Sequence, residues 1–582
     1  MIQPEADTPR GRRLMNAITA RISARATRRS ATGFISQPVP RGMGQQARGR
    51  QLLASNFIIA GHVIEAPGAS PWEIAAPHPP VAAGLQGFEW LEHLAALGDR
   101  AARETAQGWT ADWIARYGRG SGPGWTPALA GQRLRRMISH ALFLLAGDPP
   151  GGPAPLFATL AHHTAFVARR WEAAPPGLPR MEALTGLLLA ALSLEGMEGY
   201  LHPAKAGLIR ACRAQIGADG AIASRNPEEL LAMLSLLTWA ADALAEAERQ
   251  VDLALTEAIE RAAMVLRTLR HGDATLARFH GCDGGNPARL DEALALAGPR
   301  LLARDGRAMG YGRLTGGRST LIVDAAPPPI GAGVGPGHAS TLAFELTSHR
   351  RPVIVNCGSG AGFGPDWERA ARATASHSTL ALDGLSSARM AAQGGGAAPL
   401  IEGPAHVGVE REGEPSYSAF LLSHDGYVPS HGLTHLRRLD LSRDGRALIG
   451  EDTLVALTPA ERRRFERAAA RQPDAAIGFA IRFHLHPEAE ATLDLGGSAV
   501  SITLRIGEVW VLRQDGAARM TLEPSVYFEP GRLRPRATVQ IVLSGRAQDY
   551  TSQIAWSLTK AQDTPLALRD IGRDDPLALP DL

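Results

Sequence analysis

The sequence predicts a protein of two domains, an N-terminal (α/α) toroid of helical hairpins followed by a C-terminal antiparallel β-sandwich. The chain has 582 residues, more than one hydrophobic core usually supports. Apolar residues recur at the helical period in the first half and at the strand period of two after about residue 300. We therefore expect a basic lead-in over 1–50, the toroid over 51–298 and the sandwich over 299–582.

Amphipathic segments separated by Pro and Gly pairs account for the helical half. The clearest start is at Asn226, a favoured N-cap, which precedes Pro227 at the first helical position and two glutamates in the first turn. Short breaks between helices of this length indicate helical hairpins. Helices are expected over 133–146, 155–172, 180–195, 200–216, 228–247 and 250–270.

Strict alternation of apolar and polar residues marks the second half. In 500–506, Val500, Ile502 and Leu504 alternate with polar residues, as expected of a half-buried antiparallel strand. Many short strands with polar turns such as Asp444-Gly445 are typical of a sandwich. Strands are expected at 318–324, 341–347, 352–356, 378–382, 417–422, 434–441, 447–455, 480–486, 500–506, 508–513 and 537–543.

Composition excludes several classes of function. The 61 basic and 58 acidic residues leave a net charge of +3, which gives no case for nucleic acid as a partner. The 3 cysteines lack a CxxC spacing, so neither a disulfide framework nor a thiolate zinc site is expected. No apolar run reaches the roughly 18 residues that a transmembrane helix needs. Nothing in the pattern indicates an oligomeric state.

The first fifty residues are basic and include Arg12, Arg21 and Arg25, without an apolar stretch like the core of a secretory signal. The absent signal predicts a cytoplasmic protein. Such a lead-in is more often a solvated tail, and the functional alternative is that it lies on an anionic surface.

The densest cluster of unusual residues lies between 335 and 384. A Gly-Pro-Gly-His run ends at His338, and a second histidine, His377, precedes a later strand. Two histidines at the ends of neighbouring strands can converge on one cation, with an oxygen ligand from the strand between them. The alternative stays open, because a histidine at a strand end is usually a hydrogen-bonded structural residue.

These motifs resemble the heparinase II/III family. The resemblance rests on residues 338–346, on 352–358 and on 375–384, and it extends to His424-Asp425-Gly426-Tyr427 and to 482–487. It implies a divalent metal, zinc before others, held by His338, Asn356 and His377. It also implies an acidic polysaccharide or oligosaccharide as the partner, and a periplasmic location.

The departures from the family pattern concern the chemistry. Pro336 stands where the family has a histidine implicated in catalysis, Ser340 replaces an aspartate, and Asn356 replaces the metal-binding aspartate. Phe363 and Trp367 stand in the region where a catalytic tyrosine is common. Because an asparagine brings no charge, the site should bind a divalent cation less tightly than one with a carboxylate.

A uronate lyase must neutralise the substrate carboxylate, remove the C5 proton and protonate the leaving oxygen. Arg225, beside a helix N-terminus, is the candidate for the carboxylate, whereas Asn226 is weighed against the N-cap role that we favour for it. His271 and His280 are further candidates in the helical half. Tyr427 is the candidate hydroxyl, with a core tyrosine as an equal alternative.

The sequence thus predicts a polysaccharide lyase-like enzyme that cleaves a uronic-acid-containing polysaccharide or oligosaccharide by β-elimination. The rival is a catalytically degenerate carbohydrate-binding or envelope-polysaccharide-associated protein on the same scaffold. Pro336, Asn356 and Phe363 favour the rival.

Overall fold

The structure is a computed structural model, and the chain divides into two compact units that are described separately. The first unit comprises Met1–Gly217, Leu231–Ala263 and Ala288–Pro299, and the second comprises Ala218–Leu230, Met264–Pro287 and Arg300–Leu582. The residues described are 10–26, 31–36, 39–42, 44–60, 62–298, 306–331, 333–392 and 398–563.

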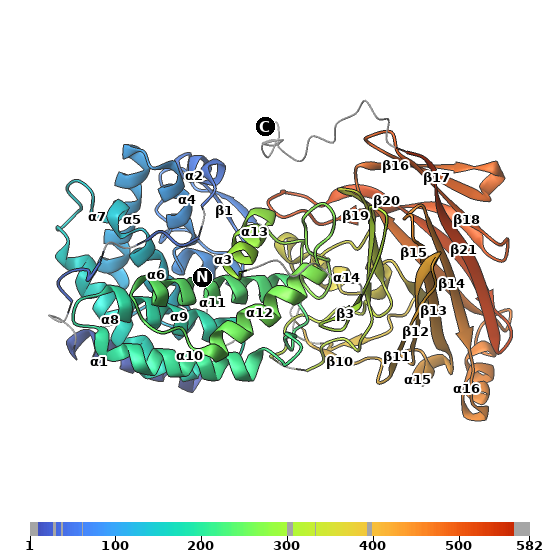
Figure 1. Cartoon of the computed structure of the whole chain (residues 1–582), viewed down its shortest axis with the longest axis horizontal. Coiled ribbons are helices and arrows are strands. Elements are labelled where there is room, and N and C mark those ends of the chain that lie inside the picture. Colours follow the sequence, from blue (N-terminus) through green and yellow to red (C-terminus); the bar gives the residue numbers. More distant parts are fainter. Residues whose placement is uncertain are drawn as a thin grey trace. The chain divides into compact units, whose positions relative to one another are not determined.

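The first unit is built from helices, with one short hairpin of two strands (Figure 1). Helices α11 and α12 begin or end in the second unit. The elements are α1 (Arg10–Ala26), α2 (Gln46–Leu53), β1 (Asn56–Ile59), β2 (His62–Glu65), α3 (Pro79–Gln86), α4 (Glu89–Leu97), α5 (Arg100–Tyr117), α6 (Pro127–Ser139), α7 (Ala141–Leu145), α8 (Ala154–Arg170), α9 (Leu178–Ser193), α10 (Leu201–Gln215), α11 (Pro227–Glu246), α12 (Leu253–Thr268) and α13 (Pro287–Leu296).

Local sequence sets where these helices start and stop. The Asn226 carboxamide accepts hydrogen bonds from the backbone N–H groups of Glu228 (2.8 Å) and Glu229 (3.2 Å), which confirms the predicted N-cap of α11. The single helix expected over 133–146 is wrong. The chain starts α6 earlier, capped by Thr126, and interrupts it at His140, where the backbone leaves the helical region.

The second unit consists of two antiparallel sheets, which confirms the predicted fold class. One sheet has the strand order β11-β12-β13-β14-β21-β18-β17-β16, and the other β19-β20-β15-β7-β6-β5-β4-β3, with β8 paired to β15. The strands are β3 (Gly306–Ala308), β4 (Tyr311–Gly316), β5 (Ser319–Asp324), β6 (Phe344–Ser348), β7 (Arg351–Val355), β8 (Leu380–Leu382), β11 (Val407–Gly413), β12 (Tyr417–His424), β13 (Thr434–Ser442), β14 (Ala447–Val455), β15 (Ile477–Leu485), β16 (Ala489–Asp494), β17 (Ala499–Leu504), β18 (Val509–Gln514), β19 (Arg519–Tyr527), β20 (Arg536–Ala547) and β21 (Thr551–Gln562).

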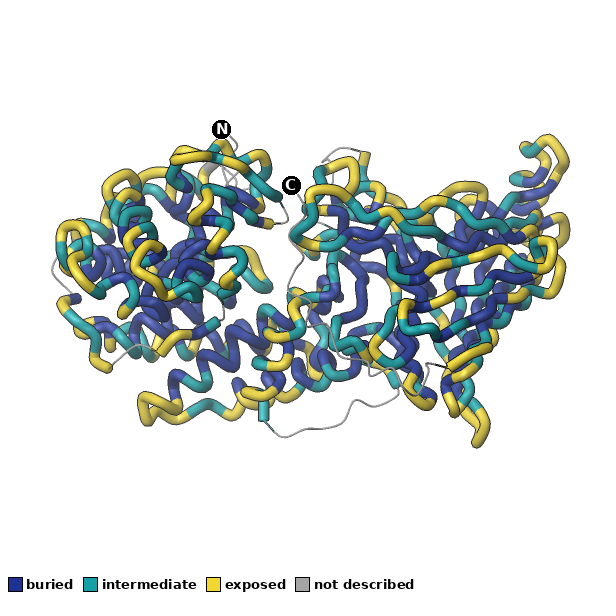
Figure 2. The backbone as a smooth tube through the Cα atoms, turned by 90° about the horizontal axis from the view of Figure 1, so that it is seen from above, coloured by how far each residue is buried: buried dark blue, intermediate teal, exposed yellow. Residues whose placement is uncertain are grey.

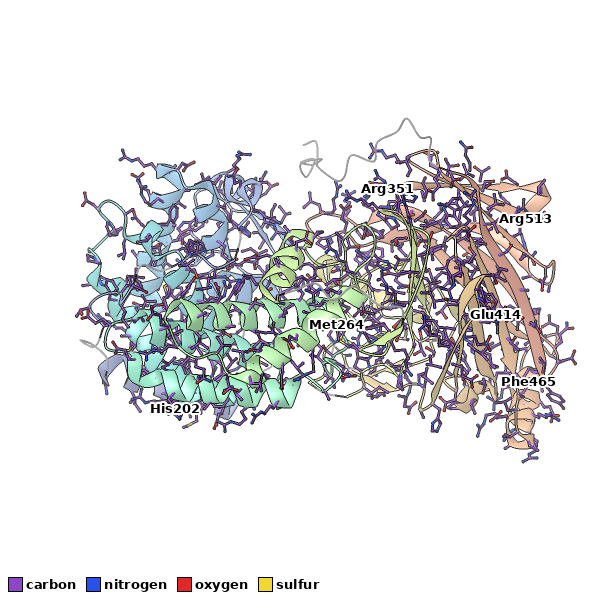
Figure 3. The ribbon with its side chains drawn as sticks, viewed as in Figure 1. His202, Met264, Arg351, Glu414, Phe465 and Arg513 are labelled. Carbon is purple, nitrogen blue, oxygen red and sulfur yellow. The ribbon has the colours of Figure 1, made fainter. Side chains whose placement is uncertain are left out.

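The two sheets share one hydrophobic core. Leu321 and Phe344 of one sheet and Phe420 of the other are buried in the same cluster. Strands β5 and β6 are buried along their whole length, and Figure 2 shows buried stretches of backbone in the interior of this unit. Three short helices and a short hairpin of β9 (Arg389–Met390) and β10 (Leu400–Glu402) complete the described part of this unit, and Phe465, labelled in Figure 3, packs into the core from the last of these helices. The helices are α14 (Pro365–Ala371), α15 (Val428–His431) and α16 (Pro459–Ala469).

No helix in the described part of the chain is long and apolar enough to cross a bilayer.

Candidate functional site

Three loops of the second unit meet at one place. A Cβ built on Gly281 would lie 3.2 Å from Asn226 Nδ2 and 3.2 Å from Pro336 Cγ, and one built on Gly335 would lie 3.4 Å from Ser224 Cβ. The loop before α11, the segment after α12 and the Gly-Pro-Gly-His run therefore pack against one another. Sequence reasoning placed Arg225 and His338 in different halves, and the structure brings them into one unit.

Arg225 lies at the centre of this junction, in a left-handed backbone conformation with φ of 53° that is uncommon outside glycine. A guanidinium has five N–H donors. Each of them meets a protein acceptor: Nε donates to Met309 O (3.2 Å), Nη1 to Ala326 O (3.2 Å) and Pro327 O (2.8 Å), and Nη2 to Gly310 O (3.0 Å) and Asp324 Oδ1 (2.5 Å). Arg225 is a buried crosslink between loops and has no donor left for a ligand.

Asp324, at the end of β5, is the counter-charge of Arg225 and is fully buried. Its Oδ2 accepts a hydrogen bond from Ser340 Oγ at 2.7 Å. Burial favours its neutral form, but Arg225 and His280 hold the pKa of Asp324 well below its usual range. The carboxylate is therefore ionised, and Ser340, which replaces an acidic residue of the family pattern, serves to hydrogen-bond it.

His280 links this ion pair to the Gly-Pro-Gly-His run. The backbone N–H of His338 donates to its Nδ1 at 3.0 Å, so the proton of the neutral ring is on Nε2. Nε2 lies 3.4 Å from Asp324 Oδ2, to which it donates, and the 3.2 Å approach of Arg225 Nη1 is then a contact between two donors. Burial lowers the pKa of His280, in line with a neutral ring.

His338 and His377 form a direct pair at the end of this chain. His377 Nδ1 donates to Ala373 O at 2.8 Å, which leaves a lone pair on its Nε2. His338 Nδ1 lies 3.1 Å from that atom and donates to it. The remaining atom, His338 Nε2, is buried and has no hydrogen-bond partner. Arg225, Asp324, His280, His338 and His377 are called the open cluster below, because it ends on this free lone pair.

Burial keeps the open cluster uncharged at its histidine end. It lowers the pKa of His377 to about 4 and that of His338 well below its ordinary value. A neutral His338 with its proton on Nδ1 presents an acceptor on Nε2, and that is the one chemical function this cluster offers to a ligand.

His271 and Asn356 belong to a neighbouring network around Glu345. The Glu345 carboxylate lies 3.1 Å from His271 Nε2 and accepts the backbone N–H groups of Arg278 (2.9 Å) and Asn356 (3.0 Å). The Asn356 carboxamide oxygen accepts the Ser378 backbone N–H at 3.0 Å. These contacts tie strands to loops, and they leave His271 and Asn356 as structural partners of a buried carboxylate.

The donor set does not fit the predicted zinc site. It offers two histidine nitrogens that already hydrogen-bond each other, and a neutral amide oxygen that already accepts a backbone N–H. Protein zinc sites use thiolate, imidazole or carboxylate ligands. Within the described residues, no group of three or more His, Cys, Asp or Glu side chains could hold a metal ion.

Tyr427 lies in the hydrophobic core of the sandwich and donates its hydroxyl to Leu380 O at 2.9 Å. Burial raises its pKa. The geometry favours the core interpretation that the sequence left open. Phe363 likewise packs against Phe528, with ring centroids 5.4 Å apart.

A second histidine cluster, called the closed cluster, lies beside Tyr427. Gly426 N donates to His424 Nδ1 (3.0 Å), His424 Nε2 donates to His435 Nδ1 (3.2 Å), and His435 Nε2 donates to Asp452 Oδ1 (2.7 Å). The Asp452 carboxylate also accepts hydrogen bonds from the Arg437 guanidinium and from Trp556 Nε1. Every ring nitrogen has a partner, so this cluster stabilises the sandwich and offers nothing to a ligand.

Sequence reasoning missed Asp324 and Tyr311. Tyr311 donates its hydroxyl to Arg225 O at 2.5 Å, and its ring lies 4.6 Å below the Arg225 guanidinium carbon. The available signal was an aspartate in an otherwise apolar run, Leu321 to Val323, since a buried carboxylate requires a cationic partner.

A helical unit followed by two antiparallel sheets is a polysaccharide lyase-like scaffold. The chain belongs to the heparinase II/III-like family, and residues 298–557 match the model described as Heparinase II/III-like, C-terminal. A relative, FtsZ-localized protein C of Caulobacter vibrioides (strain NA1000 / CB15N), is 31% identical over 549 residues, which cover 91% of this chain and 92% of that protein.

Two solved structures share the fold. Heparinase III has a TM-score of 0.69 at 12% identity, covering 93% of this chain and 89% of that one. A mutant of heparan sulfate lyase HepC from Pedobacter heparinus has a TM-score of 0.58 at 14% identity, covering 94% and 88%. At these identities the likeness concerns the fold alone.

Proposed function

We propose that this chain is a catalytically degenerate member of its family, an envelope-polysaccharide-associated protein that binds an acidic glycan without cleaving it. We also propose that it associates with FtsZ filaments. The observation that carries the proposal is the state of Arg225. All five of its N–H donors are occupied by protein acceptors, so the candidate for neutralising a uronate carboxylate cannot do so.

Two further observations support it. Pro336 stands where the family pattern has a histidine implicated in catalysis, and it packs against Gly281 in the junction of the three loops. The hydroxyl of Tyr427 is donated to a core carbonyl, which removes it as an acid for the leaving group. The link to FtsZ comes from the name of the relative that matches 91% of the chain.

The glycan half of the proposal is tested by incubating the full chain with a panel of uronate polymers while following the ultraviolet absorbance of unsaturated uronate, with heparinase III as the positive control. We expect no rise in absorbance, together with binding of at least one polymer by calorimetry. Turnover of any polymer would overturn the proposal, and so would the absence of binding to all of them.

The FtsZ half is tested by co-sedimentation of the full chain with FtsZ filaments. We expect the chain in the pellet with filaments and in the supernatant when FtsZ is kept unassembled. Equal amounts in the pellet under both conditions would contradict it.

β-Elimination is the second candidate function, and the free lone pair of His338 Nε2 favours it, because a neutral imidazole can serve as a general base. In that mechanism His338 Nε2 would take the C5 proton as the C4–O bond breaks and would then give that proton to the leaving oxygen, while His377 holds the ring through their hydrogen bond. His338→Gln would then abolish product formation on the polymer that the native chain cleaves, while a native melting temperature would show that the fold is intact.

A further inference from the structure

Helix α1 faces the protein with its small and polar side. Asn16, Ala20 and Ser23 are 1%, 0% and 0% exposed and lie on one side of the helix. Helix α8 holds this side: Arg170 Nε donates to Asn16 Oδ1 at 3.0 Å, and Arg169 Nη1 to Ser23 Oγ at 3.2 Å. Figure 1 shows α1 in dark blue beside α8.

The opposite side of α1 presents large aliphatic side chains to solvent. Leu14, Met15, Ile18 and Ile22 are 62%, 49%, 40% and 53% exposed. At 100° per residue they share an arc of about 100°, so they form one apolar stripe. This is the reverse of an ordinary surface helix, which buries its apolar side and exposes its polar one. The stripe consists of these four residues.

The charged residues of α1 all have one sign. Arg12, Arg21 and Arg25 are exposed on the same helix, and the sequence of α1 contains no Asp or Glu. An amphipathic helix with arginines beside an exposed aliphatic stripe is the composition of helices that lie in the headgroup region of a bilayer. Anionic lipids attract such arginines, whereas a second copy of the same helix would repel them.

We propose that α1 is a docking element for the surface of an anionic phospholipid bilayer, with the apolar stripe inserted among the acyl chains and the arginines at the phosphates. Helix α1 stays docked on α8, so it lies parallel to the bilayer surface and does not cross the bilayer. This inference stands independently of glycan binding and of FtsZ.

The experiment is flotation of the full chain with vesicles. We expect binding to vesicles of mixed phosphatidylglycerol and phosphatidylcholine, weak binding to pure phosphatidylcholine, and weaker binding as salt is raised. The double variant Leu14→Ser, Ile22→Ser should reduce binding to anionic vesicles at least tenfold. Because both side chains are exposed, the variant should keep the native melting temperature.

The matched control is Leu253→Ser, which removes a 71% exposed leucine from the start of α12 in the same unit and should bind like the native chain. The charge variant Arg21→Gln, Arg25→Gln should lose the preference for anionic over neutral vesicles. No binding of the native chain at low salt, or equal binding of the stripe variant, would overturn the proposal. A dimer of the native chain in solution that the stripe variant converts to a monomer would assign the stripe to a second copy instead.

Discussion

The open and closed clusters of the second unit contain the same kinds of side chain, an arginine, an aspartate and at least two histidines, and they differ in whether every histidine nitrogen has a hydrogen-bond partner. In the closed cluster the hydrogen bonds run from Gly426 through His424 and His435 to Asp452 without a gap. In the open cluster the chain of bonds ends at His338 Nε2, which has no partner. Composition and burial therefore do not separate a structural network from a candidate site, whereas a complete account of hydrogen bonds does.

The largest effect is expected at the carboxylate of the closed cluster. Asp452→Ala leaves the Arg437 guanidinium buried without its counter-charge, and removing one partner of a buried ion pair costs about 3–5 kcal/mol. Chemical denaturation of the full chain measures the loss. Asp474→Ala is the control, because its pair with Arg546 is about half exposed and should contribute less than about 1 kcal/mol. Equal losses from both variants would contradict the structural role of the closed cluster.

Acid should act more strongly through His377 of the open cluster than through His435 of the closed one. Burial lowers the pKa of His377 to about 4 from 6.5, whereas the Asp452 carboxylate partly opposes burial at His435. As the pH falls, His377 is protonated in the unfolded chain before it is protonated in the folded one. The stability that the neutral His377 gives the folded chain is therefore complete above pH 6.5 and is lost as the pH falls toward 4. The loss at His377 amounts to about 3 kcal/mol at pH 4.

The measurement compares unfolding free energies at pH 7 and pH 4 for the native chain, His377→Gln and His435→Gln. His377→Gln should shrink the difference between the two pH values by about 3 kcal/mol, and His435→Gln should shrink it less. The same difference in all three proteins would show that His377 is not the acid-sensitive group.

Replacing one histidine in each cluster by phenylalanine should separate the two again. His435→Phe removes the hydrogen bonds that this ring makes to Asp452 Oδ1 and to His424 Nε2, and it leaves the buried His424 Nε2 unsatisfied, at a cost of about 2–3 kcal/mol. His338→Phe removes one hydrogen bond, the one to His377, because the other ring nitrogen of His338 has no partner. A loss of about 1 kcal/mol in unfolding free energy is therefore expected. A cost for His338→Phe as large as for His435→Phe would mean that Nε2 has a partner in solution.

The fold followed from local patterns that are printed in the sequence. The strand expected over 447–455 is β14 to the residue, and burial alternates along its whole length. Strand β21 was overlooked although Ile554, Trp556 and Leu558 alternate in it and are buried. Helix α16 was overlooked too, although Thr458 and Glu461 form a capping box at its start.

The site could be predicted from the sequence only in part, because its geometry depends on contacts between distant segments. The sequence indicated that Arg225 and His338 matter, but it could not show that Asp324, 99 residues beyond Arg225, holds the guanidinium. Nor could it show that the hydroxyl of Tyr427 is donated to Leu380 O, 47 residues away. Which donors are already occupied is a property of the folded chain, and this property decides between a lyase and its degenerate relative.

The smallest effect is expected from chelation. The open cluster would be the metal centre if the resemblance to the family held in full, yet His338 and His377 hydrogen-bond each other and Asn356 accepts the Ser378 N–H. We expect protein purified without a histidine tag to contain no stoichiometric zinc by elemental analysis, and EDTA to leave the melting temperature unchanged. The closed cluster is the internal reference, because its ring nitrogens are all occupied and no chelator should affect it. One zinc per chain that is lost in His377→Gln and kept in His435→Gln would show that the two histidines bind a metal in place of their hydrogen bond.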